Sequence, residues 1–161
     1  GGTVIAIGTS LNSFADKEGF LLKKSKTEEK KDSLPKENLI PYNKRKLEYF
    51  NNSITGSIFK SIIDNTHPLG FGYDTNYYNL KSNSNTYKLL EEGVNVGYFP
   101  QKSKAISGYA GEKDLALIST SLLFGVEKNG KGQFIYMVDN PLFRSFWENG
   151  KLFFVNAIFL N

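Results

Sequence analysis

The stretch that decides the fold class opens the chain: Gly1-Gly2-Thr3-Val4-Ile5-Ala6-Ile7-Gly8. Its apolar residues form one continuous run, whereas a strand with one solvated face alternates apolar and polar residues. The run therefore predicts a strand that is buried on both faces, as in the parallel sheet of an α/β fold. Because such a strand normally has neighbours from earlier βα units, we expect the chain to have been cut from a longer α/β protein.

The rest of the chain carries mostly short strand signals. Strands are expected at Ser57–Asp64, Tyr77–Lys81 (an edge strand), Val94–Phe99, Lys104–Ala110 (a strand or a turn) and Phe134–Val138, the last after an Asn129-Gly130 hairpin signal. Helical or irregular segments are expected at Ser10–Phe20, Tyr42–Asn51 and Leu152–Leu160, and the last of these fits a helix packed on a sheet. Asp114–Phe124 fits a helix start followed by a strand.

The length indicates one domain, residues 1–161. The chain has enough apolar residues for a core, since 40% of its residues are hydrophobic and 14% are aromatic. Within it, the dense charge of Leu21–Asn38 predicts a mobile surface loop. The absence of cysteine excludes disulfides, thiolate metal sites and a cysteine nucleophile in these residues. No apolar run approaches the roughly 18 residues of a membrane span.

The net charge of +4 does not indicate nucleic-acid binding. Ten basic and six acidic residues between Lys17 and Glu48 account for all of it, and a mixed-sign, Lys-rich stretch is usually a solvated surface. Only two arginines occur, Arg45 and Arg144, whereas phosphate and base recognition usually draws on several. We therefore expect no nucleic-acid partner.

The sequence provides no complete catalytic set. A zinc hydrolase site usually takes three protein ligands, and His67 is the only histidine. There is no Gly-x-Ser-x-Gly elbow to supply a serine nucleophile. We expect His67 to be a turn residue before Pro68 whose ring bonds a nearby backbone group, and we keep it as a minor binding candidate. No metal ligand or catalytic residue is assigned.

The most unusual segment is Asp139-Asn140-Pro141-Leu142-Phe143-Arg144-Ser145-Phe146-Trp147-Glu148-Asn149-Gly150. It follows a predicted strand and holds the only tryptophan and one of the two arginines. Ligands of open α/β sheets bind at the carboxyl ends of strands, so Asn140, Arg144 and Trp147 are candidate binding or interface residues. In the structural alternative, Arg144 pairs with Asp139 or Glu148 while the aromatic residues seal the end of the sheet.

These residues together resemble the C-terminal region of certain bacterial zinc carboxypeptidases, which carry a class I glutamine amidotransferase-like domain after the peptidase domain. The matching stretches are Gly1–Gly8, Gly56–Lys60, Asp64–Gly72, Gly130–Gly132 and Asp139–Trp147 through the final helix. The resemblance covers most of the chain outside the charged loop, and its motifs are structural turns. It implies an α/β fold of the flavodoxin-like or amidotransferase-like type, of which this chain is the C-terminal portion.

The resemblance also implies a functional setting. The metallopeptidase domain, with its zinc, would lie upstream, and the protein would be an exported, periplasmic or extracellular hydrolase of peptides or cell-wall material. The amidotransferase triad of Cys, His and Glu is not matched: there is no cysteine, and Leu69 follows His67-Pro68 where the family has an acid. No catalytic residue is carried over, and no cofactor is expected in this chain.

We therefore expect a non-catalytic accessory domain that contacts its own upstream peptidase domain or forms a homo-oligomer. A first alternative is a small-ligand module that binds a glycan or peptide at Asp139–Trp147. An amidotransferase-like enzyme is a second alternative.

Overall fold

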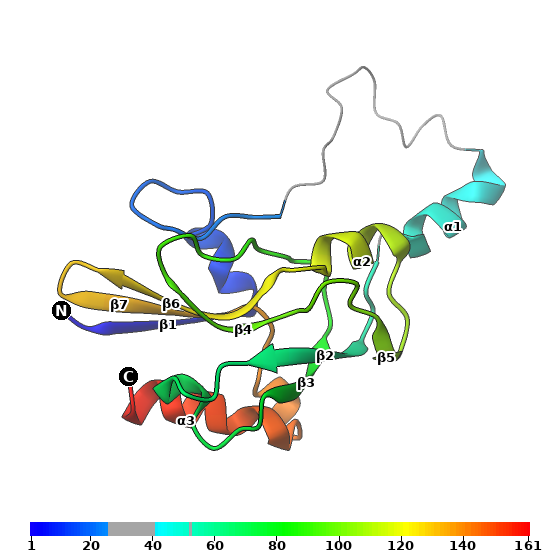
Figure 1. Cartoon of the computed structure of the whole chain (residues 1–161). Coiled ribbons are helices and arrows are strands. Elements are labelled where there is room, and N and C mark those ends of the chain that lie inside the picture. The colour runs from blue at the N-terminus through cyan, green and yellow to red at the C-terminus, as the bar shows by residue number, and fades with distance from the viewer. Residues whose placement is uncertain (26–40, 52) are drawn as a thin grey trace.

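The opening apolar run forms strand β1 (Thr3–Ile7) in the computed structural model of the chain, drawn in dark blue in Figure 1. The structure describes residues 1–25, 41–51 and 53–161. Among these, β1 pairs only with β7 (Gly132–Met137), in parallel, and it stands at one edge of the sheet. The prediction of a strand is confirmed, and the prediction that both of its faces are buried holds in part: Ala6 lies in one core, and Ile5 and Ile7 pack against the other. Val4, on the same face as Ala6, is 44% exposed, so that face of β1 is covered only toward its C-terminal end.

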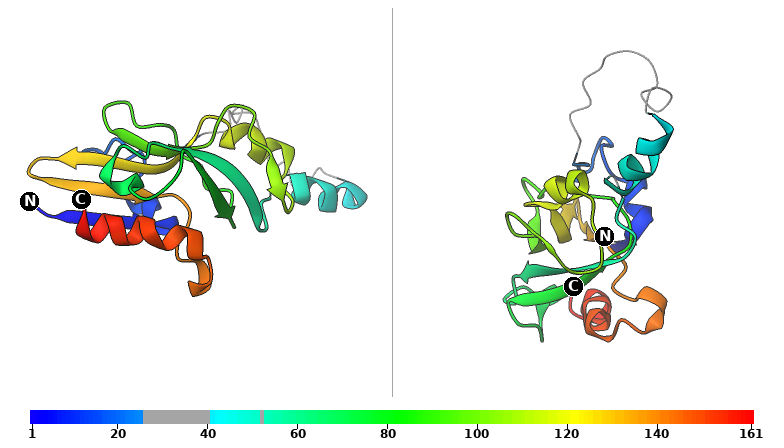
Figure 2. Two further views of the ribbon diagram at one scale, coloured as in Figure 1. Left: turned by 60° about the horizontal axis from the view of Figure 1, so that its bottom comes forward. Right: turned by 90° about the vertical axis from the view of Figure 1, so that its right-hand side faces the viewer.

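The sheet has seven strands in the order β1-β7-β6-β4-β2-β3, and β5 also pairs with β2. The remaining strands are β2 (Ser57–Ile63), β3 (Asn76–Lys81), β4 (Val94–Tyr98), β5 (Ala105–Ser107) and β6 (Leu122–Asn129). Every strand pair except β1 with β7 is antiparallel. The fold is thus a mixed α/β fold with a curled sheet and flanking helices, as Figures 1 and 2 show.

The helices are short. The α-helices are α1 (Tyr42–Asn51), α2 (Glu112–Ile118) and α3 (Lys151–Phe159). The 3-10 helices are η1 (Gly8–Ser13), η3 (Pro68–Gly70), η4 (Phe143–Ser145) and η5 (Glu148–Gly150). The expected helix at Leu152–Leu160 is confirmed as α3, and the ambiguous Asp114–Phe124 contains most of α2 and the start of β6.

The predicted β-hairpin is confirmed. Asn129 of β6 pairs with Gly132 of β7, so the turn has two central residues. The first of these, Gly130, has a φ of +58°, the left-handed conformation that tight hairpin turns require and that glycine adopts without strain. The two turn residues are therefore Gly130 and Lys131, one position later than the Asn129-Gly130 pair indicated, and this turn fixes the register of β6 against β7.

The predicted loop at Leu21–Asn38 lies outside the described residues from residue 26 onward. Its first residues are held in place: Leu22 is fully buried, and Lys24 forms an isolated bridge with Tyr87.

Each face of the sheet has its own core. On one face α3 packs through Phe153, whose ring stacks on Tyr73 at 3.9 Å and on Phe124 at 4.0 Å between centroids. The Asn156 side chain donates to the carbonyl oxygens of Leu69 and Phe71, which fixes the second half of α3 against η3. On the other face, η1 and the following loop cover a second buried cluster: Ala6, Leu11, Ala15, Leu22, Tyr87, Leu90, Leu122, Tyr136 and Val138. Figure 2 shows α3 along one side of the sheet, with the two termini near each other.

The burial of tyrosine side chains predicts that the protein loses stability at alkaline pH. Burial raises the pKa of Tyr73 to about 12, and it also raises the pKa values of Tyr77, Tyr87 and Tyr136. Because the folded-state pKa values exceed the unfolded value of about 10, the stability they contribute is complete below pH ~10 and is lost as the pH rises through the folded values. We expect the free energy of unfolding to fall between about pH 10 and pH 12.

The measurement is tyrosinate absorbance against pH, followed together with circular dichroism. We expect the four tyrosines with raised pKa values to ionise together with unfolding. Ionisation of these four near pH ~10 while the fold stays intact would contradict the raised pKa values.

Candidate functional site

The segment that follows β7 lies on the outer edge of β3. The Asn149 side-chain nitrogen donates to the carbonyl oxygen of Tyr78 at 2.9 Å, and the Tyr73 hydroxyl donates to the carbonyl oxygen of Asn149 at 2.7 Å. Behind it, a Cβ at Gly150 would lie 2.9 Å from the Tyr77 hydroxyl oxygen, so the backbone approaches the strand closely. Residues 139–150 thus cover an edge that would otherwise offer unpaired backbone groups.

Asn140 has a local structural contact. Its side chain is exposed, and its Oδ1 accepts a hydrogen bond from the backbone nitrogen of Leu142 at 2.9 Å. This is the short side-chain-to-backbone bond with which asparagine stabilises turns. The acceptor of this binding candidate is therefore engaged in shaping its own loop.

Arg144 contacts an aromatic ring instead of a carboxylate. Its guanidinium carbon lies 5.3 Å from the centroid of the Phe143 ring, within the range of a cation–π interaction. The expected pairing with Asp139 or Glu148 is wrong, because Asp139 pairs with Lys81 and Glu148 pairs with Lys151. Arg144 has a φ of +49° and Ser145 a φ of +59°, which is left-handed backbone at two consecutive non-glycine residues.

Trp147 points into the fold. Its side chain is half-buried and its Nε1 is buried beside the Tyr77 hydroxyl, although neither atom has a hydrogen bond of good geometry. Burial raises the pKa of Tyr77, and the Trp147 N–H opposes part of that rise. Asn140, Arg144 and Trp147 therefore lie in one segment but serve three separate contacts.

His67 lies elsewhere. Its Nδ1 accepts a hydrogen bond from the backbone nitrogen of Leu69 at 3.1 Å, which confirms the expected turn role. Burial lowers the pKa of His67, and the negative charge of Asp64 acts in the opposite direction. It lines a shallow hollow of about 380 Å³ with Leu160, just beyond the C-terminal end of α3. Trp147 precedes the N-terminal end of the same helix, so the fold does not bring these two candidates together.

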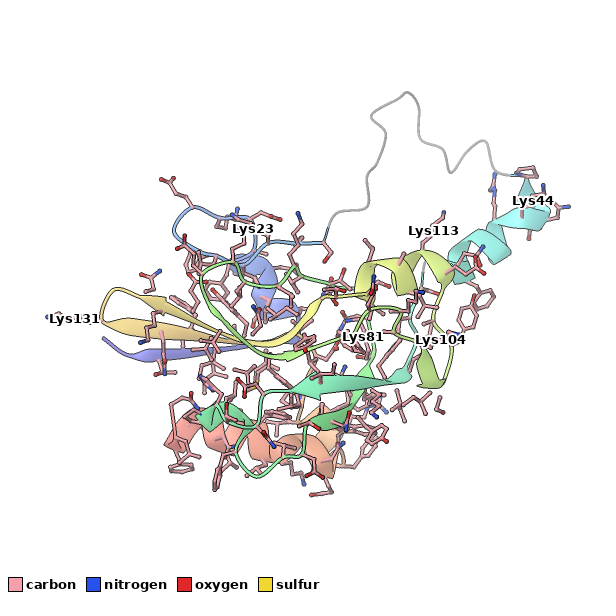
Figure 3. The ribbon with its side chains drawn as sticks, in the orientation of Figure 1. Lys23, Lys44, Lys81, Lys104, Lys113 and Lys131 are labelled. Carbon is pink, nitrogen blue, oxygen red and sulfur yellow. The ribbon has the colours of Figure 1, made fainter. Side chains whose placement is uncertain are left out.

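The sequence analysis did not predict the buried polar network around Lys81 and Asp139. Lys81 is fully buried, and its Nζ lies 3.3 Å from Oδ1 of Asp139, which is 2% exposed. The same Nζ donates to the carbonyl oxygen of Asn85 at 2.6 Å, and the Asn79 amide donates to Asp139 Oδ2 at 2.8 Å. Burial raises the pKa of Asp139, while the Lys81 charge and the Asn79 hydrogen bond oppose that rise. In Figure 3 Lys81 lies inside the fold, whereas the other labelled lysines are exposed.

A sequence signal for this network did exist. Alternation along β3 places Tyr77, Asn79 and Lys81 on one face of the strand, and all three are buried. Two polar residues on the face that carries a core tyrosine indicate that a polar partner lies opposite.

Within the described part of the chain, α3 exposes apolar side chains on the side that faces away from the core. Leu152, Val155 and Phe159, which we name the α3 stripe, are 37%, 44% and 76% exposed. Their spacing of three and four residues places them on one side of the helix, while Phe153 and Ala157 face the core. A surface helix normally has polar residues on its outer side, so an apolar outer side indicates a contact surface.

Two residues of the segment that covers β3 should contribute differently to the free energy of unfolding. Asn149→Ala removes the hydrogen bond to Tyr78 and uncovers the β3 edge, so it should lower the free energy of unfolding by about 1 kcal/mol. Arg144→Ala removes an exposed ring contact and should change it by less than about 0.5 kcal/mol. Urea denaturation of both variants measures this, and equal costs would contradict a structural role centred on Asn149.

Other observations bound the chemistry of the described residues. In residues 1–25, 41–51 and 53–161, no group of three or more His, Cys, Asp or Glu side chains is placed to hold a metal ion. No helix within the same ranges has the length and apolar character needed to cross a membrane. Comparison of the chain with protein-family models, curated proteins and solved structures gives no match.

Proposed function

We propose that the chain is a non-catalytic accessory domain that binds another protein surface through the α3 stripe. The observation that carries the proposal is that α3 is apolar on both sides, with one side in the core and the other exposed. Covering three partly exposed apolar side chains contributes on the order of 1 kcal/mol each, which is the scale of a protein–protein contact.

The partner in this proposal is the upstream peptidase domain of a zinc carboxypeptidase. The resemblance of Asp64–Gly72 and Asp139–Trp147 to that family supports this choice. Zinc and peptide hydrolysis would then belong to the peptidase domain, and the whole protein would act outside the cytoplasm. The present chain would position the catalytic domain or its large substrates.

The finer fold assignment is part of the same proposal. A flavodoxin-like or amidotransferase-like origin is supported by the parallel pairing of β1 with β7 and by the helix α3 that follows β7. The antiparallel remainder of the sheet departs from the mostly parallel arrangement of a doubly wound fold.

A second candidate function is a small-ligand module for a glycan or peptide at Asp139–Trp147. It is favoured by the strained backbone at Arg144 and Ser145, because such strain of about 1–3 kcal/mol per residue clusters at functional sites. The exposed guanidinium and the exposed Phe146 ring supply a charge and a stacking surface. Calorimetric titration with cell-wall fragments tests it, and heat that disappears in Arg144→Ala would support it.

If the α3 stripe binds the peptidase domain, charged substitutions on the stripe should separate the two domains. In the full-length protein, Val155→Glu combined with Phe159→Glu should release this domain, because an apolar contact does not accommodate unpaired carboxylates. We expect a larger radius of gyration in solution scattering and faster protease cleavage between the domains. The circular dichroism of the domain should not change, since both side chains are exposed.

Ile106→Glu is the matched control, because Ile106 is an apolar residue on β5 whose exposure of 57% lies between those of Val155 and Phe159. It should leave both measurements unchanged. A full-length protein without a peptidase domain would refute the choice of partner. A stripe variant that behaves like the control would refute the role of α3.

A further inference from the structure

His67 holds the start of η3 through a hydrogen bond that only its neutral ring can make. It is the residue immediately before η3, and its Nδ1 accepts from the backbone nitrogen of Leu69 at 3.1 Å. Because a backbone N–H can only donate, Nδ1 carries no proton, and the neutral ring keeps its proton on Nε2. An imidazolium has a donor at both nitrogens, so protonation of Nδ1 removes this bond.

The same bond lies at the junction between η3 and α3. The Leu69 side chain is fully buried in the core that contains Phe153 of α3. The Asn156 amide of α3 donates to the carbonyl oxygen of Leu69 at 3.1 Å. The residue whose N–H is bound by His67 therefore also anchors the second half of α3.

The surroundings of the ring favour its neutral form but leave it open to protons. His67 is half-buried and lines the hollow of about 380 Å³, which Phe71 and Leu160 also line. Burial lowers the pKa of His67, because a charged ring loses part of its hydration there. The ring thus changes its charge on the acid side of neutrality.

The charged group nearest in the chain is Asp64, whose negative charge offsets part of the effect of burial on His67. Its Oδ1 accepts from the backbone nitrogen and the hydroxyl of Thr66, and these bonds lower the pKa of the Asp64 carboxyl. Asp64 therefore stays ionised over the pH range in which His67 titrates.

The elements that pack against η3 bring few other ionisable groups. In β4 the only ionisable side chain is that of Tyr98, and in α3 it is that of Lys151, at the opposite end of the helix from Leu160. A larger hollow of about 730 Å³ beside His67 is also lined by three charged residues: Glu92, Glu127 and Lys128.

We propose that His67 is a pH-sensitive latch: its neutral ring fastens η3 against the second half of α3, and protonation of Nδ1 in acid releases it. Because the pKa in the folded state is lowered, the stability that the neutral ring contributes is complete above the unfolded value of about 6.5. It is lost as the pH falls through the folded value. Acid thus loosens the half of α3 that carries the exposed Phe159. The latch acts within one chain, so it does not depend on a peptidase domain.

The test uses the fact that His67 is the only histidine, so its NMR signals are unambiguous. The ring nitrogen shifts should place the proton on Nε2 at pH ~8, and the ring should titrate with a midpoint below ~6.5. Below that midpoint, the protection of the Leu69 N–H against hydrogen exchange should fall about tenfold, the scale of one lost hydrogen bond. The side-chain amide signals of Asn156 should shift with the same midpoint.

Two variants at this position separate the latch from a general effect of acid. His67→Asn keeps an acceptor for the Leu69 N–H, since asparagine caps in the same way, but it does not titrate. It should leave Leu69 protected at pH ~5 and at pH ~7.5. His67→Ala has no acceptor and should show the lower protection at both pH values. An asparagine variant with the pH dependence of the natural chain would overturn the proposal, and so would an alanine variant with full protection at pH ~7.5.

Discussion

The buried pair of Lys81 and Asp139 is the constraint on which the rest of the arrangement depends. Lys81 ends β3 and Asp139 follows β7, and three strands separate these two in the sheet. The pair therefore connects the end of β3 to the residue after β7 across the curled sheet. It does not link two neighbouring strands. Buried ion pairs often add little net stability, but breaking one leaves an uncompensated charge in the core. We infer that this pair contributes specificity: it fixes where the chain goes after β7.

The course of residues 140–150 follows from that anchor. Once Asp139 is held beside β3, Asn149 reaches the carbonyl of Tyr78 and the tight backbone at Gly150 leads into α3. The Phe153 ring then stacks on the rings of Tyr73 and Phe124. The Asn156 side chain donates to a carbonyl oxygen of η3. The segment that looked most like a ligand site thus closes one edge of the sheet. Among the described residues, the outer side of α3 remains exposed and apolar.

Local patterns in the sequence predicted local structure well. The Asn129-Gly130 signal predicted the hairpin, the spacing of apolar residues predicted α3, and the residues around His67 predicted a turn, because each depends on neighbours in the chain. The position of β1 in the sheet was not predictable in this way. An apolar run specifies a strand, but whether both of its sides are covered depends on residues distant in sequence. The charged pairing of Arg144 failed for the same reason, since Asp139 had a distant partner, Lys81.

The candidate site was less predictable than the fold. Asn140, Arg144 and Trp147 do lie in one segment, but their side chains are directed to a backbone amide, a neighbouring ring and a core tyrosine. The α3 stripe was overlooked because residues 152–160 are apolar throughout, and only the packing of Phe153 distinguishes the inner side from the outer side. Composition alone shows that such a helix is buried somewhere, not which side remains open.

The coupling between Lys81 and Asp139 can be measured with a double-mutant cycle on the free energy of unfolding. Asp139→Asn and Lys81→Met should each cost about 3–5 kcal/mol, because each leaves one charge buried without its partner. The double variant should cost less than the two single changes together, by about 2 kcal/mol or more. Additive costs that agree within about 0.5 kcal/mol would contradict the account, because the two residues would then act independently.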